Sequence, residues 1–213
     1  MKIKTVMLIL GLSLIVLCSA CSSWFNDPTP DSEKALQSAW EYFEMTNYDM
    51  AYSKFESVIS MDPGNSEAYN GRGWCYLLLN DLENAEIDFT TSIDKGYIEL
   101  DPHAGLAAVY VSSDEFTEAI SEAEYVLTQN PDYVFQYASE INYLDMHLIL
   151  AMAYFHTGDF QNSYNHILAL DPAVIIDEND SSTWTLNGHQ YDNYAEVLMA
   201  IIDKLDAQYG FYD

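Results

Sequence analysis

A spacing of 34 residues runs through the chain and constrains its fold more than any other feature. A small residue, a tyrosine, an alanine and usually a large apolar residue recur in the same order: Ala39, Tyr42, Ala51 and Phe55; then Gly73, Tyr76, Ala85 and Phe89; then Ala107, Tyr110, Ala119 and Ala123. A period of this length is typical of stacked helical hairpins, in which each unit buries its apolar face against its neighbours. The sequence therefore predicts an all-α array of helix pairs.

A fourth set of the same kind arrives late. Ala151, Tyr154, Ser163 and Ile167 keep the internal spacing but begin 44 residues after the third set, which predicts an insertion near residues 133–137. The small residue that opens each set lets two helices approach closely, and the tyrosine three positions on lies on the same helical face. Pro63, Pro131 and Pro172 each follow an Asp or Asn and predict the ends of second helices.

The best-formed repeat, Gly73-x-x-Tyr76 with Ala85-x-x-x-Phe89, resembles the tetratricopeptide repeat. The resemblance covers residues 32–172 as about four repeats. It implies a solenoid of helical hairpins whose first helices line a concave face that binds proteins or peptides. The chain departs from the family pattern at Arg72, where leucine is preferred, at Tyr97, where proline is usual, and at Ser163, where alanine is usual.

This resemblance also predicts which side chains line the concave face. They are Trp40 and Phe43 in the first repeat, Trp74, Leu77 and Leu78 in the second, and Met152 and Phe155 in the fourth; the third repeat adds only Ala104, Ala108 and Val111. Glu33, Glu44 and Glu67 lie near one end of this channel. An exposed apolar channel of this kind would indicate a protein partner. Alternatively, the C-terminal helix or the insertion at residues 133–137 fills the groove, and the sequence leaves both possibilities open.

The C-terminal part, residues 173–213, does not continue the repeat. Residues 173–177 are rich in β-formers, and Asn187-Gly188 between alternating residues favours a small β-hairpin. An apolar stripe at helical spacing follows and predicts an amphipathic helix that ends near Gly210: Tyr194, Val197, Leu198, Ile201, Ile202 and Leu205. A repeat array needs a terminal element over its last core face, so we expect this helix to be a cap.

Residues 1–20 are typical of a bacterial export signal. Lys2 and Lys4 precede an apolar run over residues 6–17, which is shorter than the roughly 20 residues of a membrane span. Cys21 after Ser19-Ala20 resembles the lipobox of bacterial lipoproteins. This resemblance implies fatty acylation of Cys21 and a lipid anchor in the cell envelope. Plain secretion and a retained anchor helix are the alternatives.

Residues beyond the lipobox refine this expectation. Ser22 resembles the signal that sorts lipoproteins to the outer membrane, where the protein would face the periplasm. Residues 21–31 contain Pro28 and Pro30 and are mostly polar, which predicts a tether between the anchor and the repeats.

The charge of the chain limits its partners. The full sequence has 34 acidic and 7 basic residues, a net charge of −27, and loss of Lys2 and Lys4 with the signal would leave five basic residues against the same 34 acids. Such a surface repels phosphate backbones and anionic lipid headgroups, which argues against nucleic acid. Cationic proteins, peptides and metal ions remain as partners, or the charge serves only to keep the surface solvated.

The residues offer little chemistry. His147, His156 and His166 are nine and ten residues apart, too far for adjacent ligands on one helix, and the acidic stretch at residues 177–188 lacks the glycine and closing glutamate of a calcium loop. Cys75, between Trp74 and Tyr76, is predicted to be a buried and inert thiol. We find no phosphate-binding loop and no nucleophile elbow.

The sequence therefore predicts a non-catalytic scaffold or adaptor that binds a protein or peptide, with no catalytic residue, no metal and no cofactor. Two alternatives of other classes remain: a structural lipoprotein that only associates with itself, and an envelope metal-binding protein or enzyme.

Overall fold

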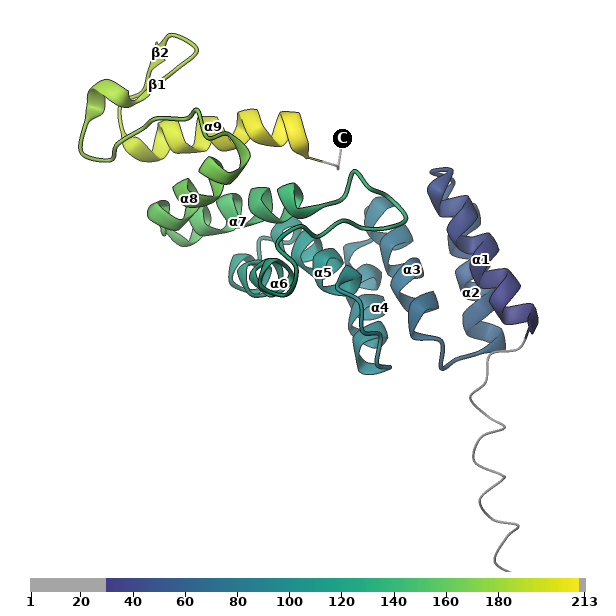
Figure 1. Ribbon diagram of the computed structural model, residues 1–213. Coiled ribbons are helices and arrows are strands. Elements are labelled where there is room, and N and C mark those ends of the chain that lie inside the picture. Colours follow the sequence, from purple (N-terminus) through teal and green to yellow (C-terminus); the bar gives the residue numbers. More distant parts are fainter. Residues whose placement is uncertain (1–29, 211–213) are drawn as a thin grey trace, which may run out of the picture.

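The computed structural model describes residues 30–210, so the expected signal, Cys21 and most of the expected tether lie outside the described residues. The described chain forms four antiparallel helix pairs, a short hairpin and a last helix, which follow one another along an arc (Figure 1). The helices are α1 (Pro30–Glu44), α2 (Tyr48–Met61), α3 (Ser66–Leu78), α4 (Leu82–Asp94), α5 (Asp101–Ser112), α6 (Phe116–Gln129), α7 (Tyr143–Thr157), α8 (Phe160–Leu170) and α9 (Tyr194–Tyr209). The prediction of an all-α array of hairpins is confirmed.

One turn geometry joins the two helices of each pair. The residues that follow the first helices have φ values of 55°, 62°, 62° and 84°, at Thr46, Asn80, Asp114 and Gly158. The first three are spaced at the 34-residue period, and this left-handed conformation ends one helix so that the next can fold back. In three of the four pairs the side chain of the next residue then caps the second helix, from Asn47, Asp81 and Asp159.

Phenylalanines on second helices connect neighbouring pairs through glycines. A Cβ atom on Gly71 would lie 2.2 Å from the ring of Phe55, and a Cβ on Gly105 would lie 2.3 Å from the ring of Phe89. Both rings are fully buried. Phe55 and Phe89 thus each pack against the next helix pair, and only glycine leaves room for the ring at these two places.

The departure from the family pattern at Arg72 has a structural reason. Arg72 Nε donates to Asp88 Oδ2 at 2.6 Å, and Nη2 donates to Asp88 Oδ1 at 2.9 Å. Asp88 is 2% exposed, and the guanidinium lies 5.5 Å from the centre of the Tyr69 ring. A paired charge from α4 thus accompanies the arginine that stands in place of leucine.

The insertion between the third and fourth repeats is a loop, residues 130–142, which we call the strap. Within the strap, Val134 pairs with Asn142 through an isolated bridge, and Phe135 N donates to Ile141 O at 2.9 Å. The Asn142 side chain and Asp145 then form a reciprocal cap on α7. This geometry folds the strap back onto the concave side of the preceding repeats.

The C-terminal part caps the array, as predicted. Helix α9 lies on α7 and α8, and all six residues of the predicted stripe are buried on it. Strands β1 (Thr185–Leu186) and β2 (His189–Gln190) pair across Asn187-Gly188, which confirms the hairpin.

Two expectations for chain segments are wrong. Residues 173–177 form no strand; their one ladder contact is an isolated bridge from Asp177 to Asp180, and Val174 O accepts instead from the hydroxyl of Tyr164. Pro30, which we placed in the tether, is the first residue of α1, a position where proline needs no N–H donor. Within residues 30–210, no helix is long and apolar enough to cross a membrane.

Candidate functional site

The strap closes the predicted apolar channel over the first two repeats. The Phe135 ring stacks on Trp74 with ring centres 4.7 Å apart and meets the edges of Trp40 and Phe43 at 6.0 Å and 5.9 Å. Trp40 is 4% exposed, Phe43 2%, and Trp74 and Phe135 are fully buried. The self-filled alternative therefore describes this part of the groove, and the occupant is the insertion.

The rest of the predicted channel is divided between other contacts. Leu77 is buried in the same cluster as the strap, while Leu78 is half-buried beside it. Met152 and Phe155 are half-buried and pack with the separate apolar cluster of α8 and α9. Of the two alternatives that the sequence left open, the open channel does not describe these residues, because two different segments cover its two halves.

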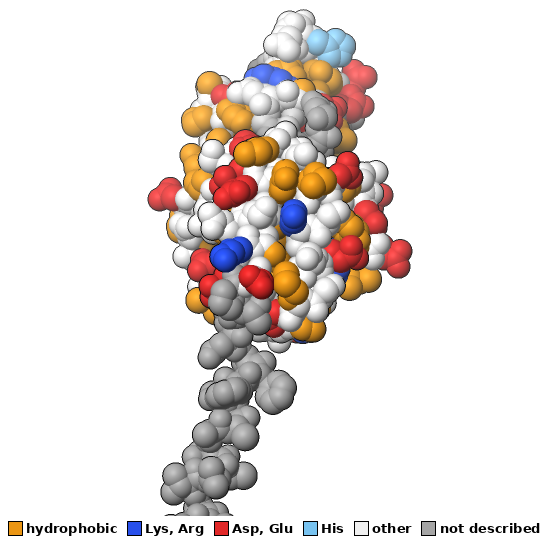
Figure 2. Space-filling model, turned by 90° about the vertical axis from the view of Figure 1, so that its right-hand side faces the viewer, with side chains coloured by type: hydrophobic (Ala, Val, Ile, Leu, Met, Phe, Trp, Pro, Cys, Tyr) orange, Lys and Arg blue, Asp and Glu red, His pale blue; other side chains and the backbone are white. Residues whose placement is uncertain are grey.

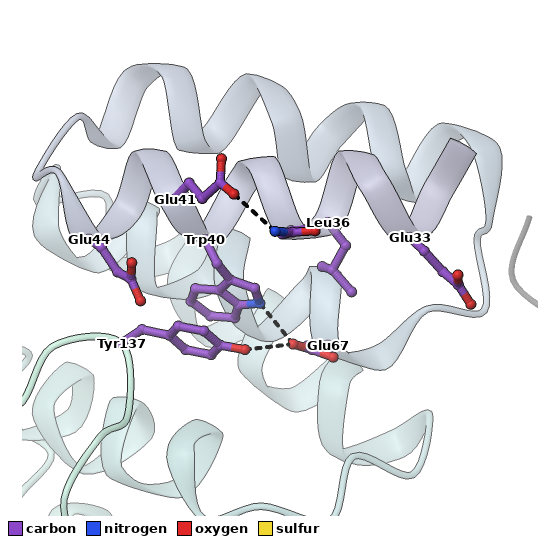
Figure 3. Close-up of a pocket in the computed structure, with 8 residues that line it drawn as sticks. Glu33, Leu36, Trp40, Glu41, Glu44, Glu67 and Tyr137 are labelled. Atoms are coloured by element: carbon purple, nitrogen blue, oxygen red, sulfur yellow. Dashed lines mark hydrogen bonds between the residues drawn. The ribbon is translucent and has the colours of Figure 1, made fainter. Parts of the chain in front are cut away.

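A pocket of about 490 Å³ remains open beside the strap (Figure 3). We call it the acidic pocket. Most of its wall comes from one face of α1, where residues recur every three or four positions, and the remainder comes from α3 and the strap. Its lining residues are Glu33, Leu36, Gln37, Trp40, Glu41, Glu44, Glu67 and Tyr137. The three glutamates that we placed near one end of the channel, Glu33, Glu44 and Glu67, all line this pocket.

Glu67 organises the floor of the acidic pocket. Trp40 Nε1 donates to Glu67 Oε1 at 2.8 Å, and the Tyr137 hydroxyl donates to the same oxygen at 3.1 Å (Figure 3). The two rings stack with centres 3.7 Å apart and planes 4° apart. Burial, and then the charge of Glu67, raise the pKa of the Tyr137 hydroxyl above its usual value, so this hydroxyl stays a neutral donor.

The walls of the acidic pocket favour a cation. Glu33, Glu41, Glu44 and Glu67 supply four carboxylates, and no lysine or arginine of the described chain lines the pocket. A guanidinium or ammonium group near stacked aromatic rings gains a cation–π contribution in addition to its charge attraction. The arrangement is suited to binding a basic side chain, and its described residues hold no nucleophile or proton-transfer pair.

Asp101 fixes the strap at its other end. The Tyr133 hydroxyl donates to Asp101 Oδ1 at 3.0 Å, and the Tyr97 hydroxyl donates to Oδ2 at 3.4 Å. Burial raises the pKa of the Asp101 carboxyl to about 6. Tyr97, which stands where the family has proline, thus binds the same carboxylate that holds Tyr133 of the strap.

The hairpin of α7 and α8 brings together two of the three histidines that we considered as metal ligands. Nδ1 of His147 and Nδ1 of His166 are 2.9 Å apart, with ring centres 5.2 Å apart, so the two nitrogens face each other across one hydrogen bond. Burial lowers the pKa of both, that of His166 to about 4, so both imidazoles are neutral at pH 7. His156 lies apart and stacks on Phe116.

The remaining candidates carry no chemistry that we can identify. Cys75 is fully buried, as predicted, and burial raises the pKa of its thiol far above the usual value. In the acidic loop, the Asp180 carboxylate accepts from Ser182 N and caps a short 3-10 turn. No three His, Cys, Asp or Glu side chains of residues 30–210 converge in a way that could hold a metal ion.

Sequence reasoning missed four members of the acidic pocket, Leu36, Gln37, Glu41 and Tyr137. Tyr137 was part of the predicted insertion, but we predicted no contact for it. Nothing in the sequence indicates its hydrogen bond to Glu67, which lies 70 positions earlier. Glu41 was detectable, because it lies about two helical turns after Glu33 and one turn before Glu44, so the three share the α1 face.

Comparisons with known proteins agree with the fold. Residues 54–87 match the model of the tetratricopeptide repeat family. The chain is 27% identical over 101 residues to a DnaJ homolog subfamily C member 7 homolog of Dictyostelium discoideum, an alignment that covers 43% of this chain but 18% of that protein. The chain thus spans less than a fifth of the length of this curated relative.

Solved structures are similar over most of the array. YrrB, described as a TPR protein with an unusual peptide-binding site, aligns with a TM-score of 0.57 at 16% identity, over 85% of this chain and 86% of its own. TTC0263, a thermophilic TPR protein of Thermus thermophilus, aligns at 0.53 and 16%, over 84% and 83% of the two chains. MamA aligns at 0.54 and 18%, over 64% and 74%. These likenesses show that the fold is that of tetratricopeptide repeat proteins.

Proposed function

We propose that this tetratricopeptide-repeat chain is a non-catalytic scaffold that binds a basic segment of a partner protein in the acidic pocket. The observation that carries the proposal is the floor of that pocket, where Glu67 joins the stacked rings of Trp40 and Tyr137 beside three further glutamates. The fold supports a protein-interaction role, since helical repeat arrays provide extended binding surfaces.

The spacing of the carboxylates favours a chain with several charges over a single ion. Glu33, Glu41 and Glu44 lie along the length of α1, where Gln37 donates to the carboxylate of Glu41, and Glu67 lines the same pocket from α3 (Figure 3). Because no three of these described carboxylates converge on one point, a metal ion would gain few ligands at once. A peptide with successive lysines or arginines would place one cation near each carboxylate.

The outer face at the α1 and α2 end of the array, which Figure 2 shows, carries its charges differently. Acidic side chains are scattered over this face and along its edges, among separate apolar side chains and a few lysine or arginine side chains. Scattered surface charges of this kind contribute to solubility and to the rate of encounter with a cationic partner. These scattered charges favour the approach of a basic partner, but they do not fix its position on the surface.

We further propose that Cys21 is fatty-acylated and that this anchor holds the protein at the bacterial cell envelope, on the periplasmic side of the outer membrane. The lipobox-like residues before Cys21 and the serine after it support this proposal. The test is Cys21→Ser in the native host. We expect the variant to leave the membrane fraction and to lack the mass of the acyl groups; a variant that fractionates with membranes like the wild type would contradict the anchor.

The binding site is tested with a fluorescein-labelled tetralysine peptide and a tetraglutamate peptide of the same length. We expect the first to bind and the second not to bind in low salt. Glu41→Gln with Glu44→Gln should weaken tetralysine binding by about tenfold, because two carboxylates near the cations become neutral. Fluorescence anisotropy at about 20 and about 200 mM salt measures both effects, since screening weakens exposed charge pairs.

The matched control carries the same charge change elsewhere. Glu83→Gln with Glu118→Gln alters two exposed glutamates on α4 and α6, outside the acidic pocket. This pair should change tetralysine affinity by less than about twofold. Equal losses from the two pairs of substitutions would mean that net charge alone attracts the peptide, and the proposed site would be wrong.

A further inference from the structure

We infer that the partner segment continues from the acidic pocket into a second pocket across Tyr137, and that it therefore carries an aliphatic stretch next to its basic residues. This inference rests on the proposed function. The second pocket has a volume of about 500 Å³ and is formed by the loop between α4 and α5 and by the strap. Its lining residues are Glu67, Tyr97, Ile98, Glu99, Leu100, Asp101, Asn130, Tyr133, Val134, Gln136 and Tyr137.

Glu67 and Tyr137 line both pockets, so the two cavities share a wall. The hydrogen bonds that Glu67 accepts from the side chains of Trp40 and Tyr137 both end on Oε1. Oε2 of the same carboxylate thus remains as an acceptor at the boundary between the pockets. A bound chain that passes this boundary could place a cation or a backbone N–H against it.

The second pocket differs from the first in its apolar rim. Ile98 is 88% exposed in the loop after α4, and Val134 is 49% exposed in the strap. They line the same pocket from two separate segments. Two aliphatic side chains that face solvent at one cavity would gain free energy if a partner covered them, at roughly 25 cal/mol per Å² of apolar surface removed from water.

Charge determines the chemistry of the occupant. Glu67, Glu99 and Asp101 line the second pocket, again with no lysine or arginine among the described residues. An acidic or purely apolar segment would bring like charges together or leave these carboxylates without a counter-charge. The complementary occupant is a segment in which basic and aliphatic residues are mixed, and the amides of Asn130 and Gln136 on this wall are suited to its backbone groups.

The strap contributes both to the core and to the two pockets. Its inward residue Phe135 fills the apolar groove, while Val134, Gln136 and Tyr137 line the pockets. The same insertion thus closes the concave face to an apolar peptide and builds one wall of a mixed site. The partner is recognised by the edge of the strap and by α1, rather than by the groove that the repeats alone would form.

Two labelled peptides test the inference. The basic probe is Lys-Lys-Lys-Lys-Gly-Ser-Ser-Lys, and the mixed probe is Lys-Lys-Lys-Lys-Gly-Ile-Ile-Lys, so both carry the same charge. We expect wild-type protein to bind the mixed probe about five- to tenfold more tightly, because the isoleucines cover the apolar rim. Ile98→Ser with Val134→Ser should abolish this gain and leave the affinity for the basic probe unchanged.

The control and the contrary outcomes separate this inference from the proposed function. Ile175→Ser removes an aliphatic side chain that is 80% exposed and lines neither pocket, so it should leave the preference for the mixed probe unchanged. Equal binding of the two probes by the wild type, or a preference that persists in Ile98→Ser with Val134→Ser, would overturn the second pocket alone. Failure of both probes to bind would instead contradict the proposed function.

Discussion

The two halves of the array cover their concave sides in different ways. Over the first repeats, the strap brings Phe135 into the core but holds it with tyrosine hydroxyls on Glu67 and Asp101. Over the fourth repeat, α9 buries an apolar stripe against the neighbouring helices. The strap, which is held by polar contacts, leaves pockets and carboxylates at its edge. Helix α9, which is held by apolar contacts, ends the solenoid.

Removal of the second cover should have the largest effect. Deletion of residues 191–213 removes α9 and with it six buried side chains that pack on α7 and α8. Burial of each side chain stabilises the fold by ~1.5–3 kcal/mol. We expect the fourth repeat to unfold, with a loss of more than about 5 kcal/mol and of the corresponding helical circular dichroism. A truncated protein that keeps its helicity and merely binds more hydrophobic dye would show that α9 is a replaceable lid.

A single substitution in the first cover should cost less. Phe135→Ala empties the space between Trp40, Phe43 and Trp74 and should lower the free energy of unfolding by about 3–5 kcal/mol. Tyr137→Phe keeps the stacked ring and loses one hydrogen bond to a carboxylate, a cost of about 1.5–3 kcal/mol. Urea unfolding measures both; a cost of Tyr137→Phe that equals or exceeds that of Phe135→Ala would contradict the larger contribution of the buried ring.

The smallest effect, and the one that separates the halves most sharply, is the response to pH. Burial raises the pKa of Asp101 and that of Asp145 to about 6, above the usual value of about 3.9. The folded state therefore binds these protons more tightly, and their contribution to stability grows as the pH falls from about 6 toward about 4. His147 and His166 have lowered pKa values, so their contribution is present above about pH 6.5 and is lost as the pH falls.

Hydrogen exchange by mass spectrometry at about pH 7 and about pH 5, corrected for the intrinsic rate, follows the two regions separately. We expect protection to rise by a few-fold in the strap and to fall by a few-fold in α8. Asp101→Asn should remove most of the response of the strap, and His166→Asn that of α8. A change of the same sign in both regions would contradict the contrast.

The sequence predicted the parts of this fold that repeat or that depend on near neighbours. The helix pairs and the stripe of α9 follow from periodicity and local chemistry. The hairpin at Asn187-Gly188 was equally local, whereas the β-formers at residues 173–177 were used for packing and not for a strand.

The candidate site was less accessible to sequence reasoning. Glu33, Glu44 and Glu67 were placed at one end of the channel, but as neighbours of an apolar groove. The strap occurs once, so no period reports its register, and its ring contacts join residues as far apart as Trp40 and Tyr137. The pairs Arg72–Asp88 and His147–His166 likewise depend on which helical faces meet across a hairpin.

The long reach of the strap has a consequence for how the protein is made. Most solenoids can complete each unit as soon as the next one has been synthesised, since contacts join nearest neighbours. Here the face formed by Trp40 and Trp74 stays uncovered until Phe135 has left the ribosome. The first three repeats therefore complete their folding together. An aggregation-prone aromatic surface stays exposed while the residues between Trp74 and Phe135 are synthesised.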